Sequence, residues 1–259
     1  MKQSTFVLVL VVAAVVSAVC IWQFILGDPS NFKDGDNRQN PNNVMGTVYV
    51  GGYVVPALIA LSIMVITFII ERALSLRKAK GRGALPTFLK NVQRSLVTGD
   101  VDSAIKACDQ QRGSMANILR AGLDRYQSLK QDSKAMEAEK QMLEVQRAIE
   151  EATALEMPIL ERNLIAMSTI ASISTMLGLF GTVIGMIRSF RALAQAGAPD
   201  AISLSIGISE ALINTALGIF AAIIGIVAYN FFVNKVDNFT YMIDEASYDV
   251  IQTLTTRGK

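Results

Sequence analysis

Polar residues embedded in apolar segments are the side chains of this sequence best placed for chemistry. Glu210 is the one charged residue between positions 202 and 233, a stretch dominated by apolar residues. A charged group at the centre of a bilayer costs about 2.5–3.5 kcal/mol on insertion scales, so such residues usually serve a function. We place Glu210 near the outer rim of the hydrocarbon, where it either reaches the lipid headgroups or pairs with Arg188.

Two threonines and an asparagine accompany this carboxylate. Thr182 lies six residues before Arg188, and Thr215 lies five residues after Glu210. The two segments are joined by a short link and run antiparallel, so both hydroxyls lie roughly 8 Å inside the outer boundary at a rise of 1.5 Å per residue. Asn214 adds an amide at that depth. Such a layer indicates a partly hydrated path for an ion; the alternative is that each hydroxyl only bonds a carbonyl one turn back in its own helix.

Small residues recur at helical spacing in the same two segments. Gly178, Gly181 and Gly185 lie in the first, and Ala211 and Gly218 lie in the second. Small side chains let helix backbones approach closely in a membrane, and Gly181 and Gly185 form the G-x-x-x-G pair typical of such contacts. We therefore predict that these five residues pack the two helices together.

The composition argues against enzyme chemistry and against a metal or cofactor site. Of 259 residues, 51% are hydrophobic and 18% are charged, and none is histidine. The usual general base and the commonest metal ligand are therefore missing. Cys20 lies in an apolar run and Cys108 in a polar helical segment, so a disulfide framework is not expected. We predict a protein that is not an enzyme, with no catalytic residue, no metal, no cofactor and no nucleic-acid partner.

Four apolar runs are long enough to cross a bilayer, which takes roughly 20 residues. They cover residues 5–26, 50–70, 164–187 and 202–233. The predicted fold class is all-α: a polytopic membrane protein with four transmembrane helices and long helices that extend into a cytoplasmic helical domain.

The first run also has features of a signal peptide. Lys2 precedes it, and Val16-Ser17-Ala18 resembles a cleavage site. The run is longer than a typical signal core and continues past that site, so we expect an uncleaved helix.

Positive residues predict the orientation, because they gather on the cytoplasmic side of membrane helices. Five follow the second run at once, namely Arg72, Arg77, Lys78, Lys80 and Arg82. The N-terminus and the C-terminal tail are then cytoplasmic. The predicted divisions are an extra N-terminal transmembrane helix with an external loop (1–49), a second transmembrane helix (50–76), a cytoplasmic helical domain (77–163), a two-helix channel-forming hairpin (164–233) and a cytoplasmic tail (234–259).

The cytoplasmic segment 85–163 carries amphipathic helical patterns that break at 98–100 and at 112–114. Asp100 or Asp102 is suited to cap the helix after the first break. From about Ser133 the pattern is continuous. If the helix passes through Pro158, which tends to kink helices, it runs to about residue 190.

Together these motifs resemble the proton-channel family of bacterial energy-transducing stators that includes ExbB, TolQ and MotA. The resemblance covers roughly residues 50–240. It is most specific at residues 177–186 (LGLFGTVIGM) and 209–218 (SEALINTALG). Residues 70–74 (IERAL) are similar to the signature at the inner end of that family's first helix, which implies that Glu71 and Arg72 act as a cytoplasmic anchor.

The resemblance implies a homopentamer in the bacterial inner membrane that encloses the single helices of two copies of a small partner similar to ExbD or TolR. Each partner helix carries an aspartate that binds the transported proton, and the resulting mechanical work reaches outer-membrane transport through a TonB-like transducer. By motif position, Thr182 and Thr215 would line the route to that aspartate. Glu210 would lie near its external entrance, with Asn214 in the same layer.

Two features depart from the family pattern. The run 5–26 is extra to the three membrane helices usual in the ExbB and TolQ branch, and Asn214 stands where a small residue is more common. We favour an ExbB-like role, with a TolQ-like role as the alternative. We favour protons as the transported ion, with sodium as the alternative. A non-conducting membrane scaffold is the alternative from a different class.

Overall fold

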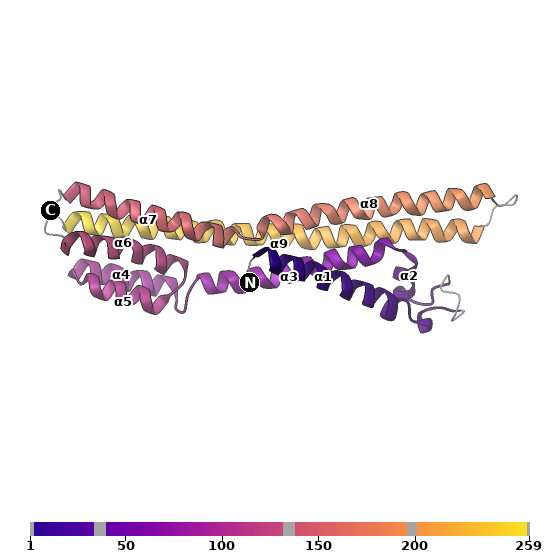
Figure 1. The fold of residues 1–259 in the computed structure, drawn as a ribbon, viewed down its shortest axis with the longest axis horizontal. Helices are drawn as coiled ribbons and strands as arrows, with labels where there is room; N and C mark the ends of the chain where they lie inside the picture. Colours follow the sequence, from indigo (N-terminus) through magenta and orange to yellow (C-terminus); the bar gives the residue numbers. More distant parts are fainter. Residues whose placement is uncertain (1–2, 34–39, 132–137, 196–200, 258–259) are drawn as a thin grey trace. The chain divides into compact units, whose positions relative to one another are not determined.

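The computed structural model describes residues 3–33, 40–131, 138–195 and 201–257. Within these ranges the regular secondary structure is helical, apart from one isolated bridge between Phe32 and Pro41 (Figure 1). Four helical stretches there each contain a segment long and apolar enough to cross a membrane: Val7–Leu26, Val54–Ala79, Ala138–Ala194 and Ile202–Thr256. The predicted all-α class with four membrane-spanning helices is confirmed.

The chain forms two compact units. The first comprises Met1–Ile70 and Leu164–Asn230, and the second comprises Glu71–Asn163 and Phe231–Lys259. Helices α3 (Val54–Ala79) and α9 (Ala201–Arg257) contribute residues to both units.

The first unit holds most of the apolar helices. Helix α1 (Gln3–Cys20) continues into a short π-helix, η1 (Ile21–Leu26), and η2 (Pro29–Asn31) and α2 (Val44–Val50) precede α3. Helix α8 (Leu164–Gln195) and the first part of α9 complete this unit and lie side by side (Figure 1). Large apolar side chains stay exposed on both helices, as expected of surfaces that face lipid or another membrane helix.

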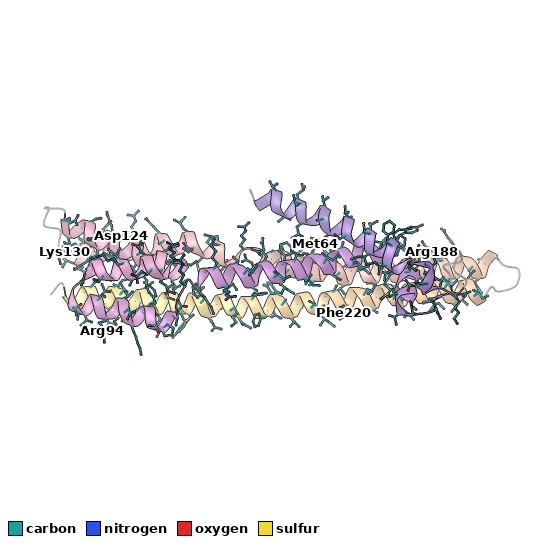
Figure 2. All side chains as sticks on the ribbon, turned by 90° about the horizontal axis from the view of Figure 1, so that it is seen from below. Met64, Arg94, Asp124, Lys130, Arg188 and Phe220 are labelled. Carbon is teal, nitrogen blue, oxygen red and sulfur yellow. The ribbon has the colours of Figure 1, made fainter. Side chains whose placement is uncertain are left out.

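Small residues form the contact between α1 and α3. Ala14 and Ala18 are buried against Ala60, and Ile63 and Met64 pack around them. Met64 is labelled in Figure 2. Alanines at this spacing lie on one face of a helix and let the two backbones approach. The first apolar run is therefore a helix packed on the membrane helix that follows it.

The second unit is a bundle of amphipathic helices. It contains α4 (Leu85–Thr98), α5 (Val101–Gln111), α6 (Ser114–Gln131), α7 (Ala138–Glu161) and the C-terminal part of α9. Its core includes Leu96, Ile118, Leu119, Leu123, Val145 and Ile243, all nearly or fully buried. Burial also raises the pKa of the Cys108 thiol to about 12, so this thiol stays protonated and unreactive at neutral pH.

The two predicted breaks between the short helices are present. Gly99 ends α4 with a φ of 85°, a left-handed conformation that suits glycine. Asp100, rather than Asp102, caps α5 by accepting hydrogen bonds from the Ser103 hydroxyl and backbone N–H, which lower the pKa of the Asp100 carboxyl. Gly113, with a φ of 96°, lies at the second break.

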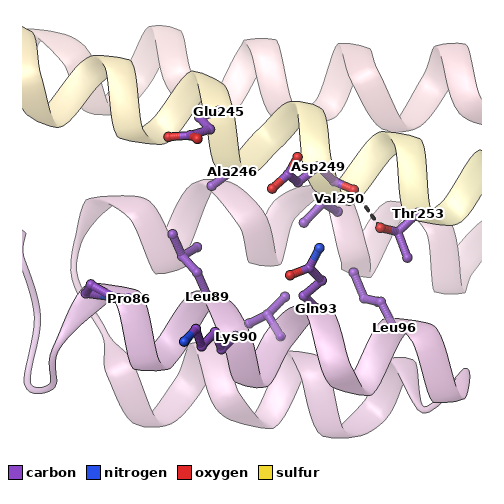
Figure 3. Close-up of a pocket in the computed structure, with 11 residues that line it drawn as sticks. Pro86, Leu89, Lys90, Gln93, Leu96, Glu245, Ala246, Asp249, Val250 and Thr253 are labelled. Carbon is purple, nitrogen blue, oxygen red and sulfur yellow. Dashed lines mark hydrogen bonds between the residues drawn. The ribbon is translucent and has the colours of Figure 1, made fainter.

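A groove separates α4 from the C-terminal part of α9 in this unit (Figure 3). Leu96, Ala246 and Val250 are buried in it, whereas Lys90 and Asp249 are exposed at its sides.

The chain does not continue as one helix from about residue 133 to 190. Helix α7 contains Pro158 but ends at Glu161, and α8 begins at Leu164. Between them Asn163 has a φ of 62°, a left-handed conformation that asparagine tolerates better than most residues. Pro158 cannot donate a backbone hydrogen bond, which weakens the last turn of α7 and favours an end there. Residues 133–137, at the start of the predicted helix, lie outside the described residues.

Candidate ion-pathway site

Glu210 and Arg188 form an ion pair between α9 and α8. One guanidinium nitrogen of Arg188, Nη1, lies 2.8 Å from each carboxylate oxygen of Glu210. The Glu210 side chain is only 2% exposed, whereas that of Arg188 is 48% exposed. Of the two arrangements considered for Glu210, the structure contains the pair with Arg188. A buried carboxylate needs such a partner, because an uncompensated buried charge is strongly unfavourable.

A glycine turn between α2 and α3 covers this carboxylate. Gly52 has a φ of 77°, and a Cβ atom there would lie 2.5 Å from Oε1 of Glu210. One helical turn along α9, the fully buried Asn214 donates from Nδ2 to the Gly51 carbonyl at 2.9 Å. Only glycine combines this backbone conformation with so close an approach. The Gly51–Gly52 turn therefore fixes the backbone against Glu210 and Asn214.

The predicted small residues lie at the contact between α8 and α9. A Cβ on Gly178 would lie 3.1 Å from the Cα of Gly218, and one on Gly185 would lie 2.9 Å from the Cβ of Ala211. Gly181 faces the side chain of Asn214. The residue numbers on α8 rise as those on α9 fall, so the two helices are antiparallel. With so little side chain between them, the backbones are nearly in contact.

The two threonine hydroxyls bond within their own helices. Thr182 donates to the Leu179 carbonyl, and Thr215 donates to the Ala211 carbonyl at 3.2 Å. Both side chains are half-buried. In this conformation each hydroxyl oxygen still has lone pairs that can accept a hydrogen bond from a neighbouring group or water.

Helical periodicity places the threonines on one side of the hairpin and the charged pair on the other. Successive residues of an α-helix are about 100° apart, so Thr182 and Thr215 are both displaced about 60° from the glycine contact, toward increasing residue number. Arg188, Glu210 and Asn214 are displaced about 40–80° in the opposite sense. Because the helices are antiparallel, residues of α8 and α9 that are displaced in the same sense lie on the same side of the helix pair.

The four predicted pathway residues are thus divided between two surfaces. Glu210 and Asn214 face the side closed by the Gly51–Gly52 turn. Thr182 and Thr215 face the other side, which we call the open side of the hairpin. The sequence indicated a shared depth for these residues but did not separate the two sides.

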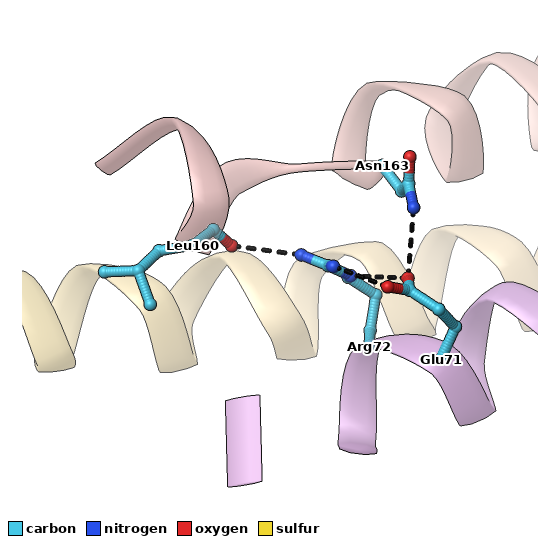
Figure 4. A network of polar contacts seen from close by, with 4 residues as sticks. All are labelled: Glu71, Arg72, Leu160 and Asn163. Carbon is cyan, nitrogen blue, oxygen red and sulfur yellow. Dashed lines mark hydrogen bonds and ion pairs between the residues drawn. The ribbon is translucent and has the colours of Figure 1, made fainter. Parts of the chain in front are cut away.

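Glu71 and Arg72, predicted as an anchor, form a second charged network in the second unit (Figure 4). Two nitrogens of Arg72 donate to the two carboxylate oxygens of Glu71, each at 2.8 Å, and Nη1 donates to the Leu160 carbonyl at 3.2 Å. Asn163 also donates to Glu71, at 3.1 Å. Leu160 lies in the last turn of α7, where backbone carbonyls have no partner within the helix, so Arg72 supplies a donor and a favourable positive charge there.

Sequence reasoning missed the Gly51–Gly52 turn. The available signal was a Gly-Gly pair at the start of the second apolar run, where a helix would begin. Adjacent glycines at a membrane boundary indicate a turn or a close backbone approach, but no feature of the sequence connects them with Glu210, more than 150 positions away.

Comparison with known proteins agrees with this architecture. Residues 110–245 match the MotA/TolQ/ExbB proton channel family. The Tol-Pal system protein TolQ of Pseudomonas aeruginosa is 33% identical over 175 residues, which cover 68% of this chain and 74% of that protein. A putative ExbB homologue of Methanothermobacter thermautotrophicus is 30% identical over 201 residues, covering 76% of this chain and 66% of that protein.

A third relative, the biopolymer transport protein ExbB of Neisseria meningitidis, is 24% identical over 206 residues, which cover 78% of this chain and 90% of that protein. The matched regions of some other relatives cover less than half of the length of those proteins. The family match covers more than half of the chain, and the relatives include both ExbB and TolQ proteins. The protein therefore belongs to the MotA/TolQ/ExbB proton channel family, a group of membrane transport proteins.

Proposed function

We propose that this protein is the channel-forming stator subunit of an inner-membrane complex driven by the proton motive force. Five copies enclose the single membrane helices of two ExbD-like or TolR-like partners. Proton flow along the contact does mechanical work, which a TonB-like transducer carries to outer-membrane transport. The pairing of Thr182 and Thr215 on the open side of the hairpin is the observation that carries this proposal.

The charges of the hairpin support a borrowed proton-binding group. Glu210 is the one acidic residue in the apolar runs 164–187 and 202–233, and Arg188 already neutralises it. On the open side, the described polar side chains of this layer are the Thr182 and Thr215 hydroxyls. A hydroxyl can relay a proton but does not bind an additional one at neutral pH. A carboxyl group on a partner helix facing Thr182 and Thr215 would complete the path.

The surface around the threonines suits a membrane helix. Leu179 and Met186 of α8, and Leu212 and Ile219 of α9, are exposed on the same side as the two threonines. Large apolar residues around a small polar layer give a helix both packing surface and a hydrogen-bonding level. Glu210 and Asn214 then have a supporting role in this proposal, holding the predicted outer end of the hairpin to the Gly51–Gly52 turn.

The native mass of the complex, purified in mild detergent from its own host membranes, tests the assembly. The proposal expects a pentamer that carries a small single-helix partner. A stable monomer or dimer without such a partner contradicts it and favours a membrane scaffold.

A TolQ-like role in the cell envelope is the second candidate. The P. aeruginosa TolQ relative, with 33% identity over 68% of this chain, favours it. Sequencing the co-purified partner separates the two roles, since an ExbD-like partner supports outer-membrane transport and a TolR-like partner supports the TolQ-like role.

The coupling ion is proposed to be H⁺. Partner-dependent transport measured at a fixed proton motive force should be independent of sodium concentration. A requirement for sodium would contradict this part of the proposal.

A further inference from the structure

The segment between α1 and α3 folds into a compact cap, which we define as the described residues 21–33 and 40–53. Asn31 is its hub and is only 5% exposed. Its Nδ2 donates to the carbonyls of Ile25 and Leu26 at 2.8 and 3.1 Å, and its Oδ1 accepts a hydrogen bond from Asn43 at 2.8 Å. Asn43 in turn caps α2 by accepting from the Gly46 N–H. The end of the first membrane helix is thus bonded to the start of α2.

Aromatic rings join the same two elements a second time. Trp22 of η1 stacks on Tyr49 of α2, with ring centroids 4.8 Å apart and an interplanar angle of 13°. Phe32 meets Tyr49 edge-on at 5.6 Å, and Tyr53 lies 5.8 Å from Trp22. Gly27 leaves room for the Tyr49 ring, because a Cβ there would lie 2.6 Å from it. The position of Tyr49 is therefore fixed from several sides.

Tyr49 leads directly to the charged pair. Its carbonyl accepts the Gly52 N–H at 3.1 Å, so it belongs to the turn that covers Glu210. The backbone of Gly52 lies so close to the Glu210 carboxylate that a Cβ there would be 2.5 Å from Oε1, so we expect a shift of the turn to displace the carboxylate. The Asn214 hydrogen bond to the Gly51 carbonyl ties the turn to α9 a second time.

We infer that Trp22 is a positioning residue for the Glu210–Arg188 pair and acts through Tyr49 and the Gly51–Gly52 turn. The coupling has two directions: loss of the Trp22 stack loosens the turn over Glu210, and loss of the Glu210 charge disturbs the environment of Trp22. The extra N-terminal helix, which carries Trp22 into the cap, is then a working part of the site. Only the effect on transport rests on the proposed function.

The coupling can be measured optically, because Trp22 is the chain's single tryptophan. The experiment records Trp22 emission and its quenching by acrylamide in the purified complex, with the spectrum of Trp22→Phe subtracted to remove any partner signal. Glu210→Gln and Gly52→Ala should each shift the emission maximum to longer wavelength and increase quenching.

Glu71→Gln is the matched control, because both oxygens of Glu71 are also held by an arginine, here through two nitrogens, but Glu71 belongs to the second unit. It should leave the Trp22 signal unchanged. If Glu210→Gln and Gly52→Ala leave the emission as in the wild type, or if Glu71→Gln shifts it equally, the inference is wrong. If Glu210→Gln does not yield folded complex, the emission of Gly52→Ala alone decides whether the coupling exists.

The reverse direction uses partner-dependent transport. Trp22→Ala should lower it on the order of tenfold, in the usual range of coupling between linked sites, whereas Trp22→Tyr should restore most of it by keeping a stacking ring. Equal loss in both variants at equal membrane abundance would contradict a role for stacking. If Glu210→Gln and Gly52→Ala shift the fluorescence but Thr182→Val has no effect on transport, the coupling stands and the proposed function is contradicted.

Discussion

Two arginine–glutamate pairs have one buried partner each, and they are arranged in opposite ways. In the first unit the acid is buried, with Glu210 2% exposed and Arg188 48% exposed. In the second unit the base is buried, with Arg72 1% exposed and Glu71 26% exposed. A buried carboxylate that loses its partner can take up a proton and become neutral, whereas an arginine guanidinium cannot give one up. Loss of Glu71 therefore leaves a buried charge on Arg72 that cannot be neutralised. Loss of Arg188 leaves a buried carboxyl group on Glu210 that can become neutral.

The largest effect is expected where the buried guanidinium loses its counter-ion. Glu71→Leu should lower the free energy of unfolding by about 3–5 kcal/mol, the range for breaking a buried pair from one side. Thermal unfolding of the purified complex, followed by circular dichroism, measures it. Glu151→Leu, which removes an exposed partner of Arg147, is the control and should change little.

The double variant Glu71→Leu with Arg72→Leu sharpens this test. Two apolar residues in place of a buried pair are often neutral, so the double variant should be more stable than Glu71→Leu alone. A double variant that is less stable would show that the Arg72 bond to the Leu160 carbonyl matters more than the pair.

Removal of Arg188 should cost less than removal of Glu71. Arg188→Leu leaves the Glu210 carboxyl buried, and its neutral form remains available, so we expect a loss of about 1–3 kcal/mol, as for a buried polar group without its partner. The same unfolding measurement applies. Arg191→Leu changes an exposed arginine three residues along α8 and serves as control. An equal loss for Arg188→Leu and Glu71→Leu would remove the distinction between the two pairs.

Gly52→Ala tests the surface that closes the first pair. The left-handed backbone and the approach to Glu210 make a loss of about 1–3 kcal/mol the expected result. Gly83→Ala is the control, since a Cβ at Gly83 meets only the end of the Gln111 side chain. Wild-type stability of Gly52→Ala would mean that the turn is not in tight contact with the carboxylate.

The smallest effect on stability is expected on the open side of the hairpin. Thr182→Val with Thr215→Val removes two hydroxyls that bond only their own helices, so stability should change by less than about 1 kcal/mol. Partner-dependent transport should nevertheless be lost. Thr175→Val, which removes the same kind of bond on α8, should leave transport unchanged. Unchanged transport in the double variant would favour the scaffold.

Much of the fold follows from local rules in the sequence. Gly99 and Asp100 end one helix and begin the next through conformational and capping preferences that act within a few residues. The glycines of α8 and the small residues of α9 likewise indicated a close helix contact before the structure located it. The sequence also allowed the pairing of Glu210 with Arg188, because the short link puts both at one depth.

Other features depended on contacts between distant segments. The end of α7 involves the Asn163 bond to Glu71 and the Arg72 bond to Leu160, which join positions 92 and 88 residues apart. Pro158 alone did not locate that end. The division of the polar layer into two sides depended on which residues of α8 and α9 face each other. The Gly51–Gly52 turn depended on the cap. Periodicity predicts a face within one helix but not which neighbour covers it.

The near-contact of Gly178 with Gly218 has a mechanical consequence. Two helices joined by long side chains can rotate against each other while those side chains change rotamers. Helices whose backbones almost touch have no such compliant layer, because protein interiors are close-packed and transmit strain. In the proposed function, a partner helix that turned against the open side of this hairpin would therefore meet a surface that resists twisting.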